Sequence, residues 1–538
     1  TLVDSHFIKP ICLDIVCAIH DDVEQNGFAS HIFVGNSLLT TYGKCGDIKK
    51  AKEVFCSLHN SNVISWNAML SVYIEQDQND MALHLYRQMV EDRVSSSEQT
   101  FTIAIQACVN ILDKQETISV KESAVMKTAI GMIGKALHAD ALKKGFTLSA
   151  YVGNNLVTMY GKCGMIVEAE YAFEGLSQSN IVSWNVMLLA YVNNGYGEAA
   201  LQLFKLMWRE GTTPSRLAFK FALRACGILA DKEGVNWVKD IVQALHVDII
   251  KEGFIEDILL GSTLMSIYSK LGLVNEVEKV FGDLFLDDVM PWNVMLSAYV
   301  ENDLNEEALK LYKKILDYSV ADDATLVCIV QACGNLGCIC FCRELHFIVI
   351  STGHIKSSLM ITTLIHAYGN CGSMIDAELL INELPKSDVV TWSAYLAGYA
   401  KQGNLIASLQ VLKQMEWMLY TPNGVTFLSV FNACNHAGLV YIGVQYFILM
   451  QSHYGINPDF KCYASMIDMM GRAGDFIRVE NLLEKTPKQN GNIWICMLGG
   501  CHIHGNMGLG TYAFQHAVEL HPEDAAVYVS MANIYSNS

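Results

Sequence analysis

Four segments centred on tryptophan residues align without gaps along this chain. They surround Trp66, Trp184, Trp292 and Trp392, and a looser fifth copy surrounds Trp494. The intervals between successive tryptophans are 118, 108, 100 and 102 residues. Self-similarity at such a period is typical of repeat architectures, in which each unit buries its apolar surface against its neighbours. A chain of 538 residues also exceeds the usual size of a single core, so we expect it to stack repeats.

Each period divides into three predicted helical hairpins. The first hairpin is short and carries the motif at 36–46, the second carries the tryptophan, and the third carries an Ala-Cys pair, as at 107–108. In the second hairpin Trp66, Leu70 and Tyr73 follow the i, i+4, i+7 spacing of an amphipathic helix. One hairpin cannot bury its apolar stripes alone, so neighbouring hairpins are expected to pack together.

The turn inside the short hairpin has its own signal. Gly46 is well placed to end the first helix in the left-handed conformation. Asp47 follows directly and can cap the second helix through its side chain. The hairpin is therefore specified by local chemistry as well as by its apolar stripes.

The predicted boundaries follow this three-hairpin rhythm. They are a partial leading repeat at 1–31, triplets at 32–149, 150–257, 258–357 and 358–459, a final short repeat at 460–490 and a C-terminal segment at 491–538. The expected fold class is all-α, a right-handed α-solenoid superhelix of tandem helix-turn-helix repeats. Two Ala-Cys hairpins carry extra residues at 112–128 and 230–238, which are expected to form loops on one edge of the solenoid.

Composition argues against several other classes of protein. No run of 18 uncharged apolar residues is present, so we expect no membrane span. The chain opens with Thr1 and shows no Arg/Ser-rich amphipathic leader, so a targeting peptide is expected to be absent or to lie outside this sequence. Most of the 17 cysteines fall at equivalent places in the repeats, which favours buried thiols in a reducing compartment over disulfides. A net charge of −18 is unfavourable for binding nucleic acid mainly through its phosphates.

The sequence contains no recognisable catalytic constellation. The segment 43–46 lacks the spacing of a phosphate-binding loop. Cys338, Cys340 and Cys342 diverge in direction along a predicted helix, which argues against a metal site. We therefore expect a non-enzymatic protein with no cofactor, no metal and no small-molecule substrate.

The order of a 31-residue hairpin, a 35-residue Trp hairpin and an Ala-Cys hairpin of about 35 residues resembles the PLS class of pentatricopeptide repeat proteins of plant organelles. The resemblance covers essentially the whole chain. Residues 493–538 resemble the C-terminal E domain of this family in a truncated form. No His-x-Glu with a downstream Cys-x-x-Cys is present, so the DYW deaminase domain that ends some relatives is expected to be absent.

In this family each hairpin faces one RNA base through two side chains, one in the first turn of its first helix and one at its last position. For the short hairpins the resemblance assigns these roles to Asn36 with Asn62, Asn154 with Asn180, Ser262 with Asp288, and Thr362 with Asp388. For the Trp hairpins it assigns them to Asn67 with Ser97, Asn185 with Ser215, Asn293 with Asp322, and Ser393 with Asn423. The residues implied to lie between successive bases are Ile64, Val182, Met290 and Val390. The Ala-Cys hairpins do not match the family's usual pairs, and the implied RNA is pyrimidine-C-any, pyrimidine-C-any, G-U-any, G-A-any from 5′ to 3′.

The resemblance implies a sequence-specific single-stranded RNA-binding protein of the mitochondrion or chloroplast. In that role it would recognise a site for C-to-U editing and recruit a deaminase-bearing pentatricopeptide repeat protein or another editing factor. Two alternatives stay open: a protein-binding scaffold of the tetratricopeptide kind, and a degenerate repeat product without a strong RNA target. Asn67, Asn185 and Asn293 are also ordinary residues for a helix start. The stripe of Trp, Tyr and Leu is expected to be core, rather than a platform on which bases stack.

Overall fold

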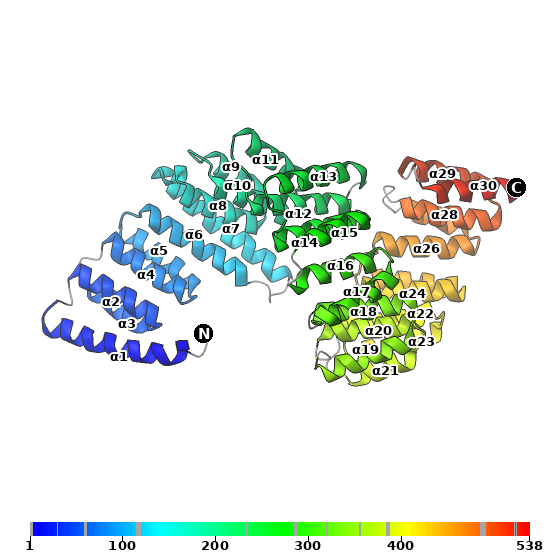
Figure 1. Ribbon diagram of the computed structural model, residues 1–538, viewed down its shortest axis with the longest axis horizontal. Coiled ribbons are helices and arrows are strands. Elements are labelled where there is room, and N and C mark those ends of the chain that lie inside the picture. The colour runs from blue at the N-terminus through cyan, green and yellow to red at the C-terminus, as the bar shows by residue number, and fades with distance from the viewer. Residues whose placement is uncertain are drawn as a thin grey trace. The chain divides into compact units, whose positions relative to one another are not determined.

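Helices make up the fold throughout the described chain. The computed structural model describes residues 4–28, 31–58, 62–114, 120–232, 235–284, 288–318, 321–353, 357–383, 388–484, 491–520, 522 and 524–537. Every element within these ranges is helical, as Figure 1 shows. The chain separates into two compact units, Thr1–Leu273 and Val274–Ser538. The all-α class predicted from the repeats is confirmed.

Unit 1 contains fourteen α-helices within the described ranges. They are α1 (Asp4–Gln25), α2 (Ile32–Cys45), α3 (Ile48–Ser57), α4 (Val63–Glu75), α5 (Asn79–Glu91), α6 (Glu98–Asp113), α7 (Val120–Lys143), α8 (Ala150–Cys163), α9 (Ile166–Glu174), α10 (Ile181–Asn193), α11 (Gly197–Arg209), α12 (Arg216–Lys232), α13 (Val235–Lys251) and α14 (Ile258–Lys270). A short 3-10 helix, η2 (Phe146–Leu148), precedes α8. Each even-numbered helix from α2 to α12 contacts the next even-numbered helix, and the odd-numbered α-helices pack against this row.

Unit 2 repeats the same arrangement. Its helices are α15 (Val274–Asp283), α16 (Val289–Glu301), α17 (Asn305–Tyr318), α18 (Asp323–Leu336), α19 (Ile339–Ser351), α20 (Ser358–Asn370), α21 (Met374–Glu383), α22 (Val389–Lys401), α23 (Leu405–Trp417), α24 (Gly424–Ala437), α25 (Val440–Ser452), α26 (Phe460–Arg472), α27 (Phe476–Leu483), α28 (Gly491–His504), α29 (Met507–Leu520) and α30 (Ala525–Asn537). Here the first helices of successive hairpins, from α16 through α28 in steps of two, contact one another. Over the residues given above, no helix is both long and apolar enough to cross a membrane.

The turn chemistry predicted for the short hairpin is confirmed. Gly46 ends α2 with φ of +87°, in the left-handed region where a glycine avoids the steric cost of a Cβ atom. Asp47 caps α3 by accepting a hydrogen bond from the Lys50 backbone N–H at 3.0 Å. Gly164 repeats the cap at the end of α8 with φ of +78°.

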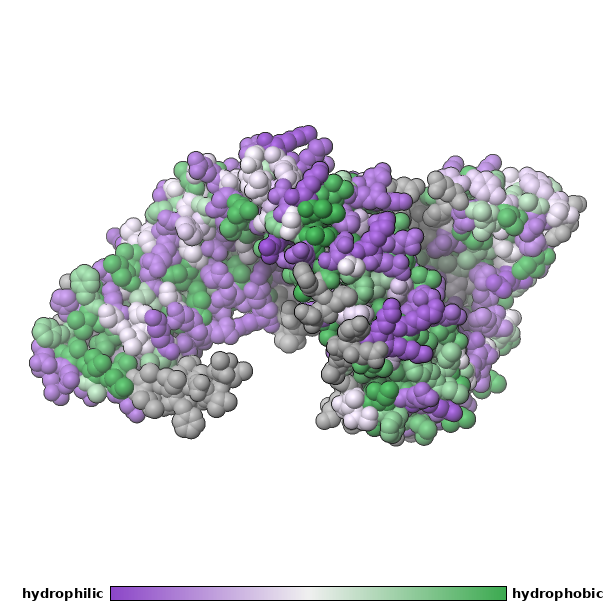
Figure 2. All heavy atoms as spheres, in the orientation of Figure 1, coloured by the Kyte–Doolittle hydropathy of each residue, from purple (hydrophilic) through white to green (hydrophobic). Residues whose placement is uncertain are grey.

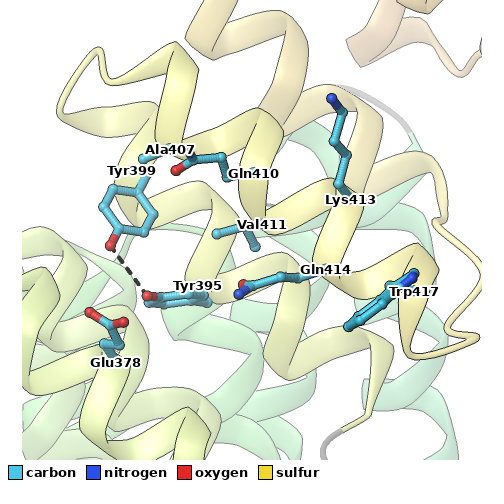
Figure 3. A pocket seen from close by; sticks show the side chains of 9 residues that line it. All are labelled: Glu378, Tyr395, Tyr399, Ala407, Gln410, Val411, Lys413, Gln414 and Trp417. Atoms are coloured by element: carbon cyan, nitrogen blue, oxygen red, sulfur yellow. Dashed lines mark hydrogen bonds between the residues drawn. The ribbon is translucent and has the colours of Figure 1, made fainter.

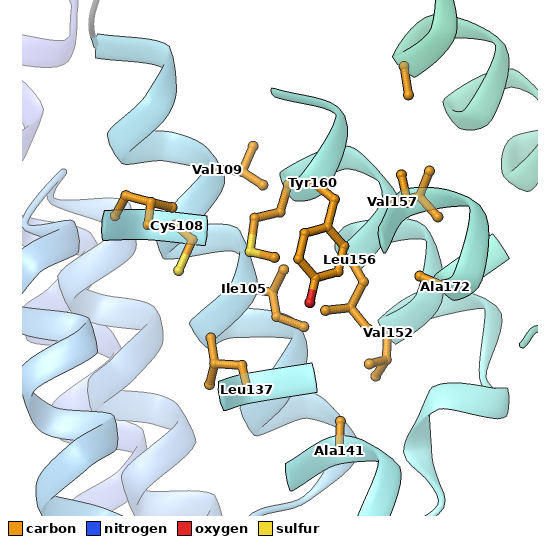
Figure 4. Close-up of a cluster of buried hydrophobic side chains, with 14 of the residues drawn as sticks. Ile105, Cys108, Val109, Leu137, Ala141, Val152, Leu156, Val157, Tyr160 and Ala172 are labelled. Carbon is orange, nitrogen blue, oxygen red and sulfur yellow. The ribbon is translucent and has the colours of Figure 1, made fainter. Parts of the chain in front are cut away.

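The tryptophan stripe lies in the core, as predicted. Trp66, Trp184 and Trp292 are each about 95% buried and each meets a phenylalanine from the preceding helix edge to face, with ring centroids 5.0 to 5.1 Å apart. Such T-shaped aromatic pairs add stabilisation beyond the buried area. Figure 4 shows part of the adjoining core, in which α6, α7, α8 and α9 bring together Ile105, Leu137, Leu156 and Ala172.

A histidine and a tyrosine spaced 22 residues apart join successive triplets. The Nδ1 to Oη distances are 3.0 Å for His20 with Tyr42, 3.1 Å for His138 with Tyr160, 3.0 Å for His246 with Tyr268, and 2.9 Å for His346 with Tyr368. Burial lowers the pKa of His138, so its imidazole is neutral at physiological pH. This hydrogen bond ties the end of an Ala-Cys hairpin to the first helix of the following short hairpin.

The prediction of loops at 112–128 and 230–238 is wrong. Helix α6 continues to Asp113 and α7 begins at Val120, while α12 ends at Lys232 and α13 begins at Val235. Residues 115–119 and 233–234 lie outside the described ranges. Residues 120–128 of the first insertion instead belong to α7, which is 24 residues long. Residues 120–129 contain no proline or glycine and include alanine, lysine, glutamate and methionine, which favour helix.

Candidate nucleic-acid interface

The predicted last-position residues share one structural role. Each is the N-cap of the helix that opens the next hairpin: Asn62 for α4, Ser97 for α6, Asn180 for α10, Ser215 for α12, Asp288 for α16, Asp322 for α18, Asp388 for α22 and Asn423 for α24. An N-cap side chain accepts a hydrogen bond from a backbone N–H of the first turn. One oxygen of each residue therefore accepts from the helix, and a second polar side-chain atom remains on the asparagine and aspartate caps only.

Capping leaves different groups available on asparagine and on aspartate. Asn62 Oδ1 accepts from two first-turn N–H groups, both at 3.1 Å, so its amide nitrogen remains. Asp388 Oδ1 accepts from the Thr391 N–H at 2.8 Å, and its Oδ2 accepts from the Ser358 hydroxyl at 2.9 Å with a lone pair to spare. Burial alone would raise the pKa of Asp388, but hydrogen bonds from Thr391 and Ser358 hold it below its ordinary value. An asparagine cap thus offers N–H donors, whereas an aspartate cap offers an anionic acceptor.

Three predicted pairs of the Trp hairpins are in direct contact. The amide nitrogen of Asn67 donates to Ser97 Oγ at 3.0 Å, that of Asn185 donates to Ser215 Oγ at 3.0 Å, and that of Asn293 donates to both carboxylate oxygens of Asp322 at 3.0 Å. The first-position side chain of one hairpin and the cap of the next therefore form a single polar site.

Two further pairs are joined through a threonine of the following helix. The links are Ser393 to Thr426 at 2.8 Å and Thr426 to Asn423 at 3.0 Å, and Thr362 to Thr391 at 2.9 Å and Thr391 to Asp388 at 2.7 Å. The predicted partners in these hairpins belong to one hydrogen-bonded group without touching each other directly.

The first-position residues of the other short hairpins are placed differently. The Oδ1 atoms of Asn36 and Asn154 and the Oγ atom of Ser262 are buried and have no hydrogen-bond partner within the described chain. A hollow of about 500 Å³ opens beside Asn36, and Asn62 and Ile64 also line it. Buried polar atoms are nearly always hydrogen-bonded, so these three atoms are exceptions within the described chain. Ser262 and its predicted partner Asp288 belong to different units.

The predicted base-flanking residues are exposed apolar side chains. Ile64, Val182, Met290 and Val390 are 43 to 59% accessible, each at the second residue of its helix. The same position holds further exposed apolar residues that were not predicted: Phe33, Tyr151, Leu217, Leu259, Leu359 and Val425. The repeat pattern could have identified these residues, because each is the second residue of its helix, as Ile64 is.

A hollow of about 440 Å³ in unit 2 is not this interface. Figure 3 shows its lining, which comes from α21, α22 and α23 and includes Glu378, Tyr395 and Trp417. Tyr399 and Tyr395 are hydrogen-bonded there with their hydroxyl oxygens 3.2 Å apart. None of the predicted reading residues lines it, so the hollow supplies no part of the proposed base recognition.

Several lysines near the ends of first helices are paired with carboxylates. Lys162 pairs with Asp113, and Lys270 lies 3.0 Å from Asp231. On the face shown in Figure 2, hydrophilic and hydrophobic residues are interspersed. Among the described residues no cluster of three or more His, Cys, Asp or Glu side chains could hold a metal ion. The lysines of these two pairs are therefore already matched by carboxylates.

Profiles of known repeats match much of the chain. A PPR repeat family profile matches residues 61–110 and 179–227, a PPR repeat profile matches 36–63, 262–288, 291–320 and 360–389, and a pentatricopeptide repeat domain profile matches 385–436. A chloroplastic pentatricopeptide repeat-containing protein of Arabidopsis thaliana is 30% identical over 96% of this chain, which spans 61% of that protein. A mitochondrial one from the same plant is 31% identical over 93% of this chain and is covered to 70%.

Solved structures show the same fold. The crystal structure of the maize pentatricopeptide repeat protein PPR10 aligns with a TM-score of 0.55 and 16% identity over 93% of this chain and 81% of that one. Its complex with an 18-nucleotide psaJ RNA element aligns with a TM-score of 0.52 and 15% identity over 94% and 82% of the two chains. At such low identity the likeness concerns the helical-repeat architecture alone.

Proposed function

Because the chain belongs to the pentatricopeptide repeat family, we propose that it binds single-stranded RNA sequence-specifically, one base per hairpin. The observation that carries the proposal is that five first-position side chains are linked, directly or through a threonine, to an N-cap of defined chemistry. Asn67 with Ser97 and Asn293 with Asp322 are examples. The maize PPR10 complex supports the ligand class, since that protein shares the fold and is bound to RNA.

The caps supply a physical basis for choosing bases. Guanine and uracil present N–H donors at the centre of their Watson–Crick edges, whereas cytosine and adenine present a ring-nitrogen acceptor there. An aspartate cap such as Asp388 therefore suits guanine or uracil, and an asparagine cap such as Asn423 suits cytosine or adenine. The RNA implied by the family resemblance has G facing Asp388 and A facing Asn423. The resemblance and the chemistry of the caps therefore select the same bases at these two positions.

The exposed apolar residues at the second helical position suit the spaces between bases. Ile64 lines the same hollow as Asn36 and Asn62, which places an apolar group beside two amide groups. Base faces are apolar, so such residues can separate successive bases without choosing among them. Affinity then depends on sequence match more than on phosphate contacts, as expected for a net charge of −18.

Binding is tested by gel shift with a 12-mer that matches the implied RNA and with one in which G and pyrimidine are exchanged at the read positions. Each mismatched base is expected to cost roughly 1–3 kcal/mol, so the exchanged RNA should bind at least about a hundredfold more weakly. Equal affinity for the two RNAs would contradict base reading. Binding to neither RNA would favour a protein scaffold or a degenerate product.

For the biological role, we propose a PLS-class recognition factor for C-to-U editing in a mitochondrion or chloroplast. The three-hairpin rhythm and the E-like segment, which contains α28 to α30, support this role. Deamination is assigned to an activity outside the repeat array, such as a deaminase-bearing pentatricopeptide repeat protein or another editing factor recruited in trans. A plant line that lacks the protein should accumulate unedited transcript at one or a few sites. Unchanged editing at every organellar site would exclude the role.

A further inference from the structure

A third side chain accompanies the predicted reading pairs inside each unit. It is the third residue of the helix that the capping residue opens, here called the N3 residue. The N3 residues are Ser65, Thr100, Ser183, Ala218, Thr325, Thr391 and Thr426, and all seven are buried. Their identity differs from hairpin to hairpin, and the hydrogen bonding of the first-position residue differs with it.

A threonine at N3 engages the first-position side chain. The Thr100 hydroxyl donates to Asn67 Oδ1 at 2.6 Å while Asn67 donates to Ser97, and Ser97 Oγ lies 3.0 Å from Thr100 Oγ1. The three side chains form a closed ring of hydrogen bonds. Whichever of the two hydroxyls donates to the other, the oxygen and the nitrogen of the Asn67 amide are both hydrogen-bonded, and one amide N–H is left without a partner in the ring. Contacts of the same kind join Thr325 to Asn293 at 2.6 Å, Thr391 to Thr362 at 2.9 Å and Thr426 to Ser393 at 2.8 Å.

A serine at N3 turns to the cap instead. Ser65 Oγ donates to Asn62 Oδ1 at 3.3 Å, and Ser183 Oγ donates to Asn180 Oδ1 at 3.1 Å. The first-position asparagines of these two hairpins are Asn36 and Asn154. Their side-chain carbonyl oxygens have no hydrogen-bond partner within the described ranges. No hydrogen bond to that oxygen within the described ranges then fixes which end of the amide faces outward.

An alanine at N3 gives a third arrangement. In the hairpin with Ala218, Asn185 Nδ2 and Oδ1 both lie against the single hydroxyl of Ser215, at 3.0 and 3.3 Å. A hydroxyl can donate or accept, so it satisfies the amide in either orientation. Asn185 therefore has the same reading partner as Asn67, a serine cap, but no closed ring.

We infer that the N3 residue is a positioning residue for base selection, which rests on the proposed RNA-binding function. A threonine there occupies the carbonyl end of the first-position asparagine and leaves it one N–H to offer a base. A closed asparagine meets the acceptors of cytosine or uracil and rejects the donor-rich edge of guanine. An open asparagine can turn its oxygen toward guanine N1–H, so it discriminates less.

The first two Trp hairpins form a matched test, because they share the Asn-Ser pair and differ at N3. Thr100→Ala gives the first hairpin the open arrangement of the second, and Ala218→Thr gives the second the closed arrangement of the first. The readout is the ratio of Kd for guanine to Kd for cytosine at nucleotide 2, which faces Asn67, and at nucleotide 5, which faces Asn185. In the wild type this ratio should be about tenfold larger at nucleotide 2, as one hydrogen bond would give.

Thr100→Ala should lower the ratio at nucleotide 2 to the value at nucleotide 5, and Ala218→Thr should raise the ratio at nucleotide 5. Each variant should leave the other nucleotide unchanged. Thr100→Val keeps the branched shape but removes the hydroxyl, so it should lower the ratio at nucleotide 2 as Thr100→Ala does. Because the ratio compares two RNAs on one protein, a uniform loss of folded protein does not alter it, and Thr100→Ala with Thr100→Val suffices if Ala218→Thr does not fold.

An unchanged ratio at nucleotide 2 in Thr100→Ala, or equal weakening toward every RNA, would overturn the inference and leave Thr100 as a helix cap alone. Failure of the proposed function has a different signature. In that case the wild-type protein itself would not bind the 12-mer, or would treat guanine and cytosine alike at every read nucleotide.

Discussion

Replacing Trp184 with alanine is expected to lower the free energy of unfolding by about 3–5 kcal/mol, the usual cost of deleting a large buried aromatic side chain. Trp184 is 4% exposed and packs edge to face on Phe173 with ring centroids 5.1 Å apart. A cavity between two hairpins is costly because each hairpin buries its apolar stripe only against its neighbours. Urea denaturation followed by far-UV circular dichroism should show the first transition at a lower denaturant concentration.

Trp184→Phe is the matched control. The indole Nε1 of Trp184 is buried without a hydrogen-bond partner in the part of the chain that the structure describes. Phenylalanine therefore sacrifices no hydrogen bond and leaves a smaller cavity than alanine does, so the loss of unfolding free energy should be well below that of Trp184→Ala. If Trp184→Phe destabilised as much as Trp184→Ala, a polar role of the indole that the structure does not show would have to be invoked.

The fold was predictable because its signals are local and repeated. The stripe of Trp66, Leu70 and Tyr73, the glycine turn at Gly46 and the cap at Asp47 each lie within a few residues of the structure they specify. The insertion at 112–128 was misjudged because extra length says nothing about conformation. Its composition, which favours helix, was the better guide.

The candidate site was predictable only in part. The residues Asn62 and Asp388 precede predicted helices, and such residues are favoured as caps, so their structural role could be inferred from sequence. The contacts of Thr100 with Asn67 and of His138 with Tyr160 join residues more than 20 positions apart. They depend on how closely two hairpins approach, which no local pattern states. The reading of bases by the eight pairs stays a prediction.

Exchanging two caps should exchange the bases they select. Asp388→Asn turns an acceptor cap into a donor cap in the hairpin at 358–388, and Asn423→Asp does the reverse in the hairpin at 389–423. In both residues Oδ1 is held by the N–H of a first-turn threonine, at 2.8 and 3.0 Å, so the exchange alters chiefly the other polar atom. Asparagine and aspartate cap helices about equally well, so little stability should be lost.

The expected change in preference follows from the base edges. Guanine N1–H and N2–H can donate to a carboxylate oxygen, whereas adenine N1 can accept from an amide N–H. A well-formed contact of this kind discriminates by about 1–3 kcal/mol, so each preference should shift by roughly tenfold or more. Asp322, which is proposed to face nucleotide 8, is untouched, so the proposed preference for uracil there should persist in every variant and serves as the internal control.

The most direct test of sequence-specific reading is the Kd of wild type, Asp388→Asn, Asn423→Asp and the double variant for four 12-mers with GA, AA, GG or AG at nucleotides 10 and 11. The wild type should bind GA best, Asp388→Asn should bind AA best, Asn423→Asp should bind GG best, and the double variant should bind AG best. The same ranking of the four RNAs by all four proteins, whatever their affinity, would contradict the account.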